Sequence, residues 1–223
     1  MRTKTFEDFK KLFPEFYNSV KNLHNSTSHI DYGGHKIDHD ITVSMLAVKI
    51  IKDKKVAKKA WCAAMLHSVD RMVPKEKIKA TMETISKSLN HFFNDVEIKE
   101  IIEAAFRHSE RNQHNQSETQ QVLMDADRLA NMQYAVIIRG GQHRPNLPVF
   151  EFEYLSGKCN PLSNYESPKS ILDNLRIIIT SYTEQLRIPK AKRLGDVYGK
   201  KLQKFITSIE KDYEYLGLKN SVI

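Results

Sequence analysis

The chain has 223 residues and a formal net charge of +8, and 40% of its residues are hydrophobic while 28% are charged. This is the composition of a folded, soluble protein that is long enough to bury a core. The two cysteines, Cys62 and Cys159, exclude a disulfide framework. No apolar stretch reaches the roughly 20 residues that a membrane-spanning helix needs. The start, MRTKTFEDFKKLF, lacks the apolar core of a signal peptide, so we expect a cytoplasmic location.

The first half of the chain is predicted to be helical. An amphipathic helix is expected from Thr5 to His24, followed by a polar, turn-rich segment over 25–34. A mostly apolar helix is predicted from Asp38 to Lys52, and its lack of a polar face places it at the centre of the fold. Another apolar helix is expected over Val56–Leu66, ending at His67.

Helix-start patterns continue after this point. Pro74 suits the first turn of a helix that is expected to run to Phe92. Two further helices, one reaching His108 and one carrying Asp127, follow patterns that resemble capping boxes. The paired residues are Asn94 with Glu97 and Ser117 with Gln120.

The stretch 139–167 interrupts the helical pattern. It is expected to form a long irregular loop, of the kind that often serves as a lid or an interface element. Its glycines and prolines are Gly140, Gly141, Pro145, Pro148, Gly157 and Pro161. Helices are then expected over 168–216, the first starting at Ser167-Pro168 and the last following Pro189. With no internal repeat, the chain is predicted to be one all-α domain over 1–223, a compact helical bundle.

Several candidate site residues lie at the ends of these apolar helices. His39, at a helix start, is either a structural residue with a buried partner or a metal ligand. His67 suits a helix C-terminus, whose partial negative charge attracts a protonated imidazole, and it equally suits a metal. Asp127 lies between apolar turns, where a carboxylate needs a cation or a metal, and a salt bridge with Arg128 is the alternative. His108 closes an apolar helix as His67 does. Together, the histidines and the carboxylate suit a hard or borderline divalent metal.

At these residues the chain resembles the HD-domain superfamily of metal-dependent phosphohydrolases, which carries the order His…His-Asp…Asp on a compact helical bundle. GHKIDH is similar to the first-histidine segment, with His39 as the implied ligand. AAMLHSVDR is similar to the segment of the His-Asp doublet, with His67 as the histidine, and DADRL to the last-aspartate segment, with Asp127. RHS, around His108, is similar to a segment of several small members in which that histidine faces the substrate phosphate or a second metal. By motif, the resemblance covers residues 31–132.

The chain departs from this family at Ser68. In the family, the residue after the second histidine is the aspartate that completes the metal site, whereas serine is a neutral, weaker ligand. Asp70 replaces it only if the chain leaves the helix directly after His67, because two helical positions rotate a side chain by about 200°. Arg71 has the planar guanidinium that suits direct binding of a phosphate.

The resemblance implies a metal-dependent phosphohydrolase that acts on a small phosphorylated compound, with a nucleotide as the first candidate. His39, His67 and Asp127 would hold the divalent ion, and the sequence does not distinguish among Mn, Fe, Ni, Mg and Zn. The ion would lower the pKa of a bound water and polarise a phosphoryl oxygen. The implied catalytic residues are His35, Asp38 and His108, and the implied substrate-binding residues are Arg71, His108 and Arg128.

An alternative stays open, because Ser68 removes one carboxylate from the implied site. The chain is then a weakly active or inactive relative that binds a nucleotide or another phosphate ligand without turnover. The basic surface suits such anionic partners. Lysines interleaved with acidic residues, without alternating aromatic residues, argue against a nucleic-acid partner. No membrane partner is expected, and a homo-oligomer is left open.

Overall fold

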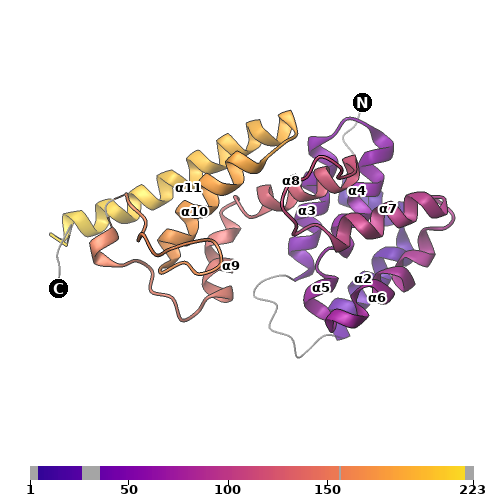
Figure 1. The fold of residues 1–223 in the computed structure, drawn as a ribbon, viewed down its shortest axis with the longest axis horizontal. Coiled ribbons are helices and arrows are strands. Elements are labelled where there is room, and N and C mark those ends of the chain that lie inside the picture. Colours follow the sequence, from indigo (N-terminus) through magenta and orange to yellow (C-terminus); the bar gives the residue numbers. More distant parts are fainter. Residues whose placement is uncertain (1–4, 27–35, 156, 219–223) are drawn as a thin grey trace. The chain divides into compact units, whose positions relative to one another are not determined.

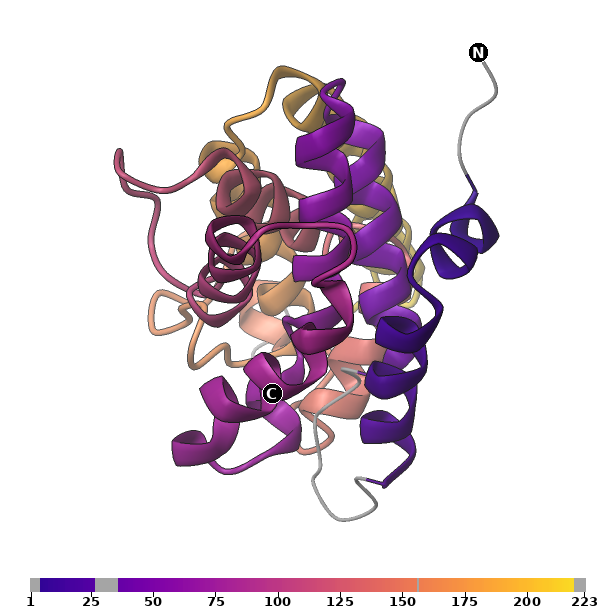
Figure 2. The ribbon, with the colours of Figure 1, turned by 90° about the vertical axis from the view of Figure 1, so that its right-hand side faces the viewer.

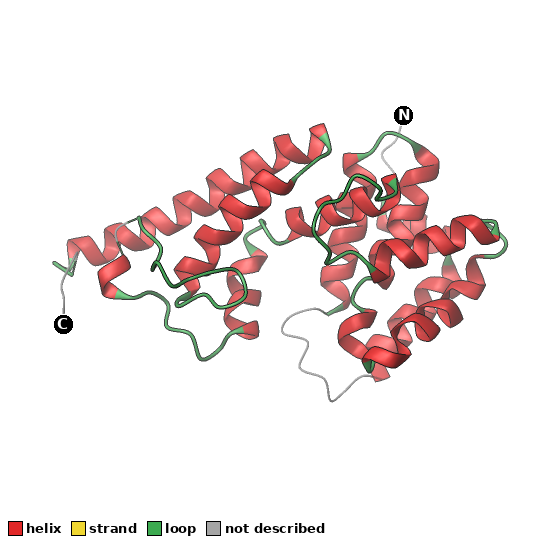
Figure 3. Ribbon diagram, viewed as in Figure 1, coloured by secondary structure: helices red, strands yellow, loops and turns green. Residues whose placement is uncertain are grey.

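The computed structural model describes residues 5–26, 36–155 and 157–218, and every regular element in these ranges is a helix (Figures 1 and 3). The all-α prediction is therefore confirmed. The chain divides into two compact units, Met1–Ala130 and Asn131–Ile223. The single domain expected over 1–223 stays a prediction. Among the helices of the described ranges, none combines the length and the apolar character needed to cross a membrane.

The first unit begins with two helices where the sequence predicted one. These helices, α1 (Phe6–Leu12) and α2 (Pro14–Ser26), are separated at Phe13, whose backbone leaves the helical region. The predicted helix over Thr5–His24 is wrong at this point, because a proline restricts the residue before it and cannot donate the helical hydrogen bond. The rings of Phe9 and Phe13 stack on Trp61, with centroids 5.5 and 5.7 Å away, and so attach both helices to the core.

Three helices form the centre of this unit. They are α3 (Ile37–Ile50), α4 (Lys54–Leu66) and α8 (Glu118–Ala130), and each packs against the other two. Helices α3 and α4 run side by side (Figure 2). Small side chains, including Ala60, Ala63 and Ala64 of α4, are fully buried and let the backbones approach closely. The predicted central position of the apolar helix over 38–52 is confirmed.

The helices around this centre differ from the prediction in one respect. Where one helix was expected from Pro74 to Phe92, the chain forms the short pieces η1 (Lys75–Lys77), α6 (Ile78–Ser86) and η2 (Lys87–Leu89). The short helix α5 (Val69–Met72) precedes them, and α7 (Asp95–Phe106) follows as a separate helix. The tighter 3₁₀ turns at both ends of α6 shorten that helix. The capping box of Asn94 and Glu97 is present at the start of α7 as predicted.

The second unit contains α9 (Ala135–His143), η3 (Phe152–Tyr154), α10 (Ile171–Gln185) and α11 (Pro189–Tyr215). The irregular stretch therefore begins after His143, and the expected start at 139 is wrong. Gly140 and Gly141 lie inside α9 rather than in a loop. Since the helical penalty of a glycine is only about 1 kcal/mol, the rest of α9 sustains the helix through both residues.

Arg176 of α10 ties the irregular stretch to the two long helices. Its guanidinium donates to the carbonyl oxygens of Tyr154, Leu155 and Lys158 at 3.0, 3.0 and 2.8 Å, and it pairs with Glu210 of α11 at 2.7 Å. The residue is only 8% exposed. The carbonyl groups that the loop leaves without helical partners are thus satisfied by one buried cation.

We expect Arg176→Met to destabilise the second unit by about 3–5 kcal/mol, the usual effect of removing one partner from a buried ion pair. Thermal unfolding and limited proteolysis of residues 144–170 measure this effect. Arg193→Met, on the exposed side of α11, is the matched control and should leave both readouts unchanged. Equal protease resistance of the two variants would contradict this account of the loop.

Candidate metal centre

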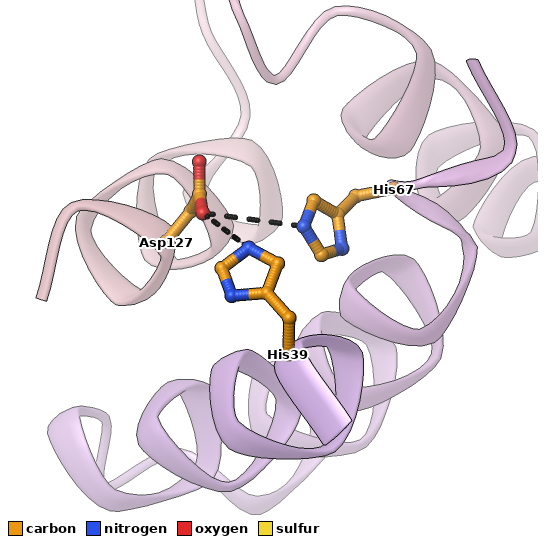
Figure 4. Close-up of side chains that lie close together, drawn as sticks. All are labelled: His39, His67 and Asp127. Carbon is orange, nitrogen blue, oxygen red and sulfur yellow. Dashed lines mark hydrogen bonds and ion pairs between the residues drawn. The ribbon is translucent and has the colours of Figure 1, made fainter. Parts of the chain in front are cut away.

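His39, His67 and Asp127 converge inside the first unit (Figure 4). His39 lies in the first turn of α3, His67 follows the last residue of α4, and Asp127 lies in the last turns of α8. One ligand atom from each residue lies within 4.8 Å of the other two. Because these three helices pack against one another, residues separated by up to 88 positions meet at one point.

The distances suit ligands of a single ion. Nε2 of His39 lies 3.1 Å from Oδ1 of Asp127, and Nε2 of His67 lies 4.0 Å from the same oxygen (Figure 4). Metal–ligand bonds are about 2 Å long, so the ligand atoms of one ion lie within roughly 4 Å of one another. Two imidazole nitrogens and a carboxylate form a donor set for a borderline divalent metal. The three residues therefore fit such an ion.

The end of α4 orients His67. Its Nδ1–H donates to the carbonyl oxygen of Ala64 at 2.5 Å, which satisfies one of the carbonyl groups left open at a helix end. Since a carbonyl only accepts, Nδ1 carries the proton and Nε2 keeps its lone pair. A hydrogen bond on the other ring nitrogen commonly fixes a metal-binding histidine, so His67 is held in the form that a metal requires.

Asp127 is an ionised carboxylate in this environment. Burial alone raises the pKa of its carboxyl group, but the hydrogen bond from His39 and the nearby His67 and His108 outweigh it, and the pKa lies well below its ordinary value. The side chain of Asp127 is 22% exposed, whereas those of His39 and His67 are nearly inaccessible. The carboxylate is thus the most solvent-accessible of the three groups.

His108 extends the centre on the far side of His67. Its ring meets that of His67 edge-on, with centroids 5.1 Å apart. Its Nδ1–H donates to the carbonyl oxygen of Ala105 at 2.8 Å, so Nε2 is again the nitrogen left with a lone pair. Burial, and then the nearby His67, lower the pKa of His108. His108 therefore lies beside His67, and the catalytic and substrate-binding roles assigned to it stay predictions.

The chain does leave the helix directly after His67. Ser68 has a backbone conformation outside the helical region, and the short helix α5 follows it. Asp70 lies in this helix, and its carboxylate raises the pKa of His108, opposing the larger effects of burial and His67. Within the described residues, Oδ1 of Asp70 is buried without a hydrogen bond, although Nε of Arg71 lies 3.6 Å away. Asp70 therefore acts on the protonation of His108.

The remaining predicted site residues are placed less closely. Asp38 is exposed in the first turn of α3, and Arg71 is exposed on α5. Arg128 is buried, and its Nη1 lies 3.4 Å from Oδ1 of Asp125. His35 lies outside the described residues. The roles assigned to these four residues stay predictions.

Sequence reasoning missed two residues next to the centre, Asp40 and His24. Asp40 is fully buried, and its two oxygens accept hydrogen bonds from Ser68 at 2.5 Å and from His24 at 2.8 Å. A pattern that could have revealed Asp40 was available, because it shares the helical spacing of the buried residues Val43, Ser44 and Ala47. His24, near the end of α2, shares such a spacing as well, since it lies four residues after the buried Val20.

Comparisons with known proteins find one family model and similar folds. The family model of the HD domain matches residues 37–132. The fold is similar to that of a crystal structure from Lactobacillus plantarum, with a TM-score of 0.67, 17% identity, and coverage of 90% of this chain and 97% of the other. It is equally similar to an HD-superfamily hydrolase from Bacillus thuringiensis, with a TM-score of 0.66, 17% identity, and coverage of 92% and 98%. A search of curated proteins found no match.

We expect the purified protein to bind about one divalent ion per chain and His67→Ala to lose it, since a site with three protein ligands cannot spare one. Elemental analysis after dialysis measures the metal content, and circular dichroism checks that the helices persist. His91→Ala, at an exposed histidine of the same unit, should keep the ion. Equal metal content in the two variants would contradict the assignment of His67.

Proposed function

Because residues 37–132 match the family model of the HD domain, we propose that this chain is an HD-superfamily protein and a metal-dependent hydrolase that cleaves a phosphate ester of a small compound. The observation that carries the proposal is the convergence of His39, His67 and Asp127 from three helices. The HD-superfamily name of the structural relative from Bacillus thuringiensis supports the hydrolase class. The phosphate ester is our finer inference.

The residues around the centre have distinct parts in such a reaction. When bound by His39, His67 and Asp127, a divalent ion supplies a water of lowered pKa and polarises a phosphoryl oxygen. His108 presents Nε2 to a substrate, because its Nδ1 is held by a backbone carbonyl. From that position it can form a hydrogen bond to a phosphoryl oxygen or exchange a proton.

The rest of the neighbourhood suits an anionic substrate. Arg71 is exposed close to Asp70, so its guanidinium is accessible to a phosphate from solvent. The net charge of +8 attracts anions over a longer range. A phosphorylated small molecule, with a nucleotide as the first class to examine, is therefore the substrate that we propose.

Ser68 favours a second candidate function. A neutral residue at this position weakens the metal site, so a protein that binds a phosphate ligand without turnover is the rival of the enzyme. Metal-loaded protein tested with p-nitrophenyl phosphate, bis-p-nitrophenyl phosphate and a panel of nucleotides separates the two functions. Hydrolysis supports the enzyme. Ligand binding by calorimetry without product supports the rival.

We expect His108→Gln to lower kcat for the hydrolysed substrate by roughly 100-fold while the metal content stays unchanged, because a group that transfers a proton contributes about that much or more. Steady-state kinetics with parallel elemental analysis measure both quantities. His114→Gln, at an exposed histidine in the following loop, is the matched control. Unchanged kcat in His108→Gln would remove this residue from the reaction.

A further inference from the structure

The hydroxyl of Ser68 is bonded to a buried carboxylate. Its Oγ donates to Oδ1 of Asp40 at 2.5 Å, and the two residues are only 1% and 0% exposed. A carboxylate is costly to bury unless donors surround it. Here the second oxygen, Oδ2, accepts from Nε2 of His24 at 2.8 Å. Both oxygens of Asp40 are therefore satisfied inside the unit.

The same hydroxyl also lies beside the metal-binding nitrogen. Oγ of Ser68 is 3.5 Å from Nε2 of His67, a separation found between two ligands of one ion. A hydroxyl has one proton and two lone pairs. Because the hydroxyl proton of Ser68 points to Asp40, the lone pairs of Oγ are available on the side where His67 lies. The oxygen is thus positioned as a donor atom next to His67.

The negative charge that position 68 lacks is present at Asp40. Its Oδ1 lies 3.5 Å from Nδ1 of His67, so the carboxylate lies directly behind the centre. A hydroxyl that donates to a carboxylate becomes more negative at oxygen, since hydrogen bonds polarise one another in a medium of low dielectric. Ser68 bonded to Asp40 is therefore a stronger ligand than an isolated serine.

We propose that Ser68 and Asp40 act together in place of the aspartate that HD-domain proteins have after the second histidine. Ser68 contributes Oγ as a further ligand atom for the metal. Asp40 is the positioning residue, because its carboxylate accepts the hydrogen bond from the Ser68 hydroxyl and so orients that oxygen. His24 fixes the second oxygen of Asp40. The inference rests on the metal site of the proposed function.

This arrangement predicts how substitutions at the two positions interact. Ser68→Asp alone places a second carboxylate against Asp40, and two buried like charges at such a distance repel. Ser68→Asp combined with Asp40→Asn removes the repulsion, because the amide introduced at position 40 can donate to the new carboxylate. The double variant should therefore bind metal more tightly than Ser68→Asp alone.

Cobalt spectroscopy of the full chain tests the position of Ser68. Metal-free wild type, Ser68→Cys and Ser86→Cys are titrated with Co²⁺. Ser86 is the matched control, since it is a fully buried serine of α6. We expect a sulfur-to-cobalt charge-transfer band only in Ser68→Cys. The wild-type spectrum accounts for Cys62 and Cys159. Spectra of Ser68→Cys and wild type that coincide, with Co²⁺ bound in both, would overturn the role of Ser68.

Binding constants test the part of Asp40. We expect Asp40→Asn to weaken Co²⁺ binding by about 10- to 100-fold, as loss of an outer partner of a metal ligand does, and Ser68→Ala, which removes the proposed donor itself, to weaken it by at least as much. The combination of both substitutions should cost little more than either one, because the residues act as a unit. Additive losses, or wild-type affinity in Asp40→Asn, would overturn the coupling. If Asp40→Asn fails to fold, the cysteine variant still decides whether Ser68 faces the metal.

The wild type separates this inference from the proposed function. Tight binding of Co²⁺ by wild type and its loss in His67→Ala, together with unaltered binding in Ser68→Ala and Asp40→Asn, leave the proposed function intact and reject only the inference. Absence of Co²⁺ binding in wild type rejects the metal dependence itself, and the inference with it.

Discussion

The first unit depends on how two carboxylates, Asp40 and Asp127, are accommodated among apolar helices. A buried carboxylate is tolerated only where donors or cations surround it. Asp40 receives the hydroxyl of Ser68 and the imidazole of His24, and Asp127 receives the imidazole of His39. The packing of α3, α4 and α8 brings these donors together from distant parts of the sequence. The polar contacts at the centre of the bundle therefore link these helices in addition to the apolar packing between them.

The end of α4 gives this network its geometry. A helix leaves its last carbonyl groups without partners, and the imidazole of His67 turns back to bond that of Ala64. Directly after this break, the hydroxyl of Ser68 reaches Asp40, and the carboxylate of Asp70 raises the pKa of His108. The end of one helix thus orients the imidazole of His67 and begins the segment that carries two further polar residues of the centre.

Much of the fold and of the centre could be predicted from the sequence. The contacts that could not be predicted join residues that only the packing of the helices brings together. The apolar helices and the set of His39, His67 and Asp127 were accessible because periodicity and motif order are local properties of the chain. The break at Phe13 was also predictable from a neighbouring residue, because Pro14 directly follows it. The partnership of Asp40 with Ser68 and His24 was not accessible, because hydrogen bonds across 28 and 16 positions depend on packing. The C-terminal half of helix α9 was predicted as a loop, because Gly140 and Gly141 have low helix propensity and the stabilising effect of the surrounding helix is not visible in the sequence.

If Ser68 and Asp40 act together as proposed, the two positions are epistatic. An aspartate at 68 would then be compatible with a neutral residue at 40, and a serine at 68 with a carboxylate at 40, whereas each exchange alone would give an unfavourable intermediate. A lineage that passes between the two arrangements must change both sites, and the order of the changes determines which intermediate is exposed to selection. A search that requires the adjacent His-Asp doublet would classify this chain as degenerate, although a carboxylate stands 28 positions earlier in contact with the serine.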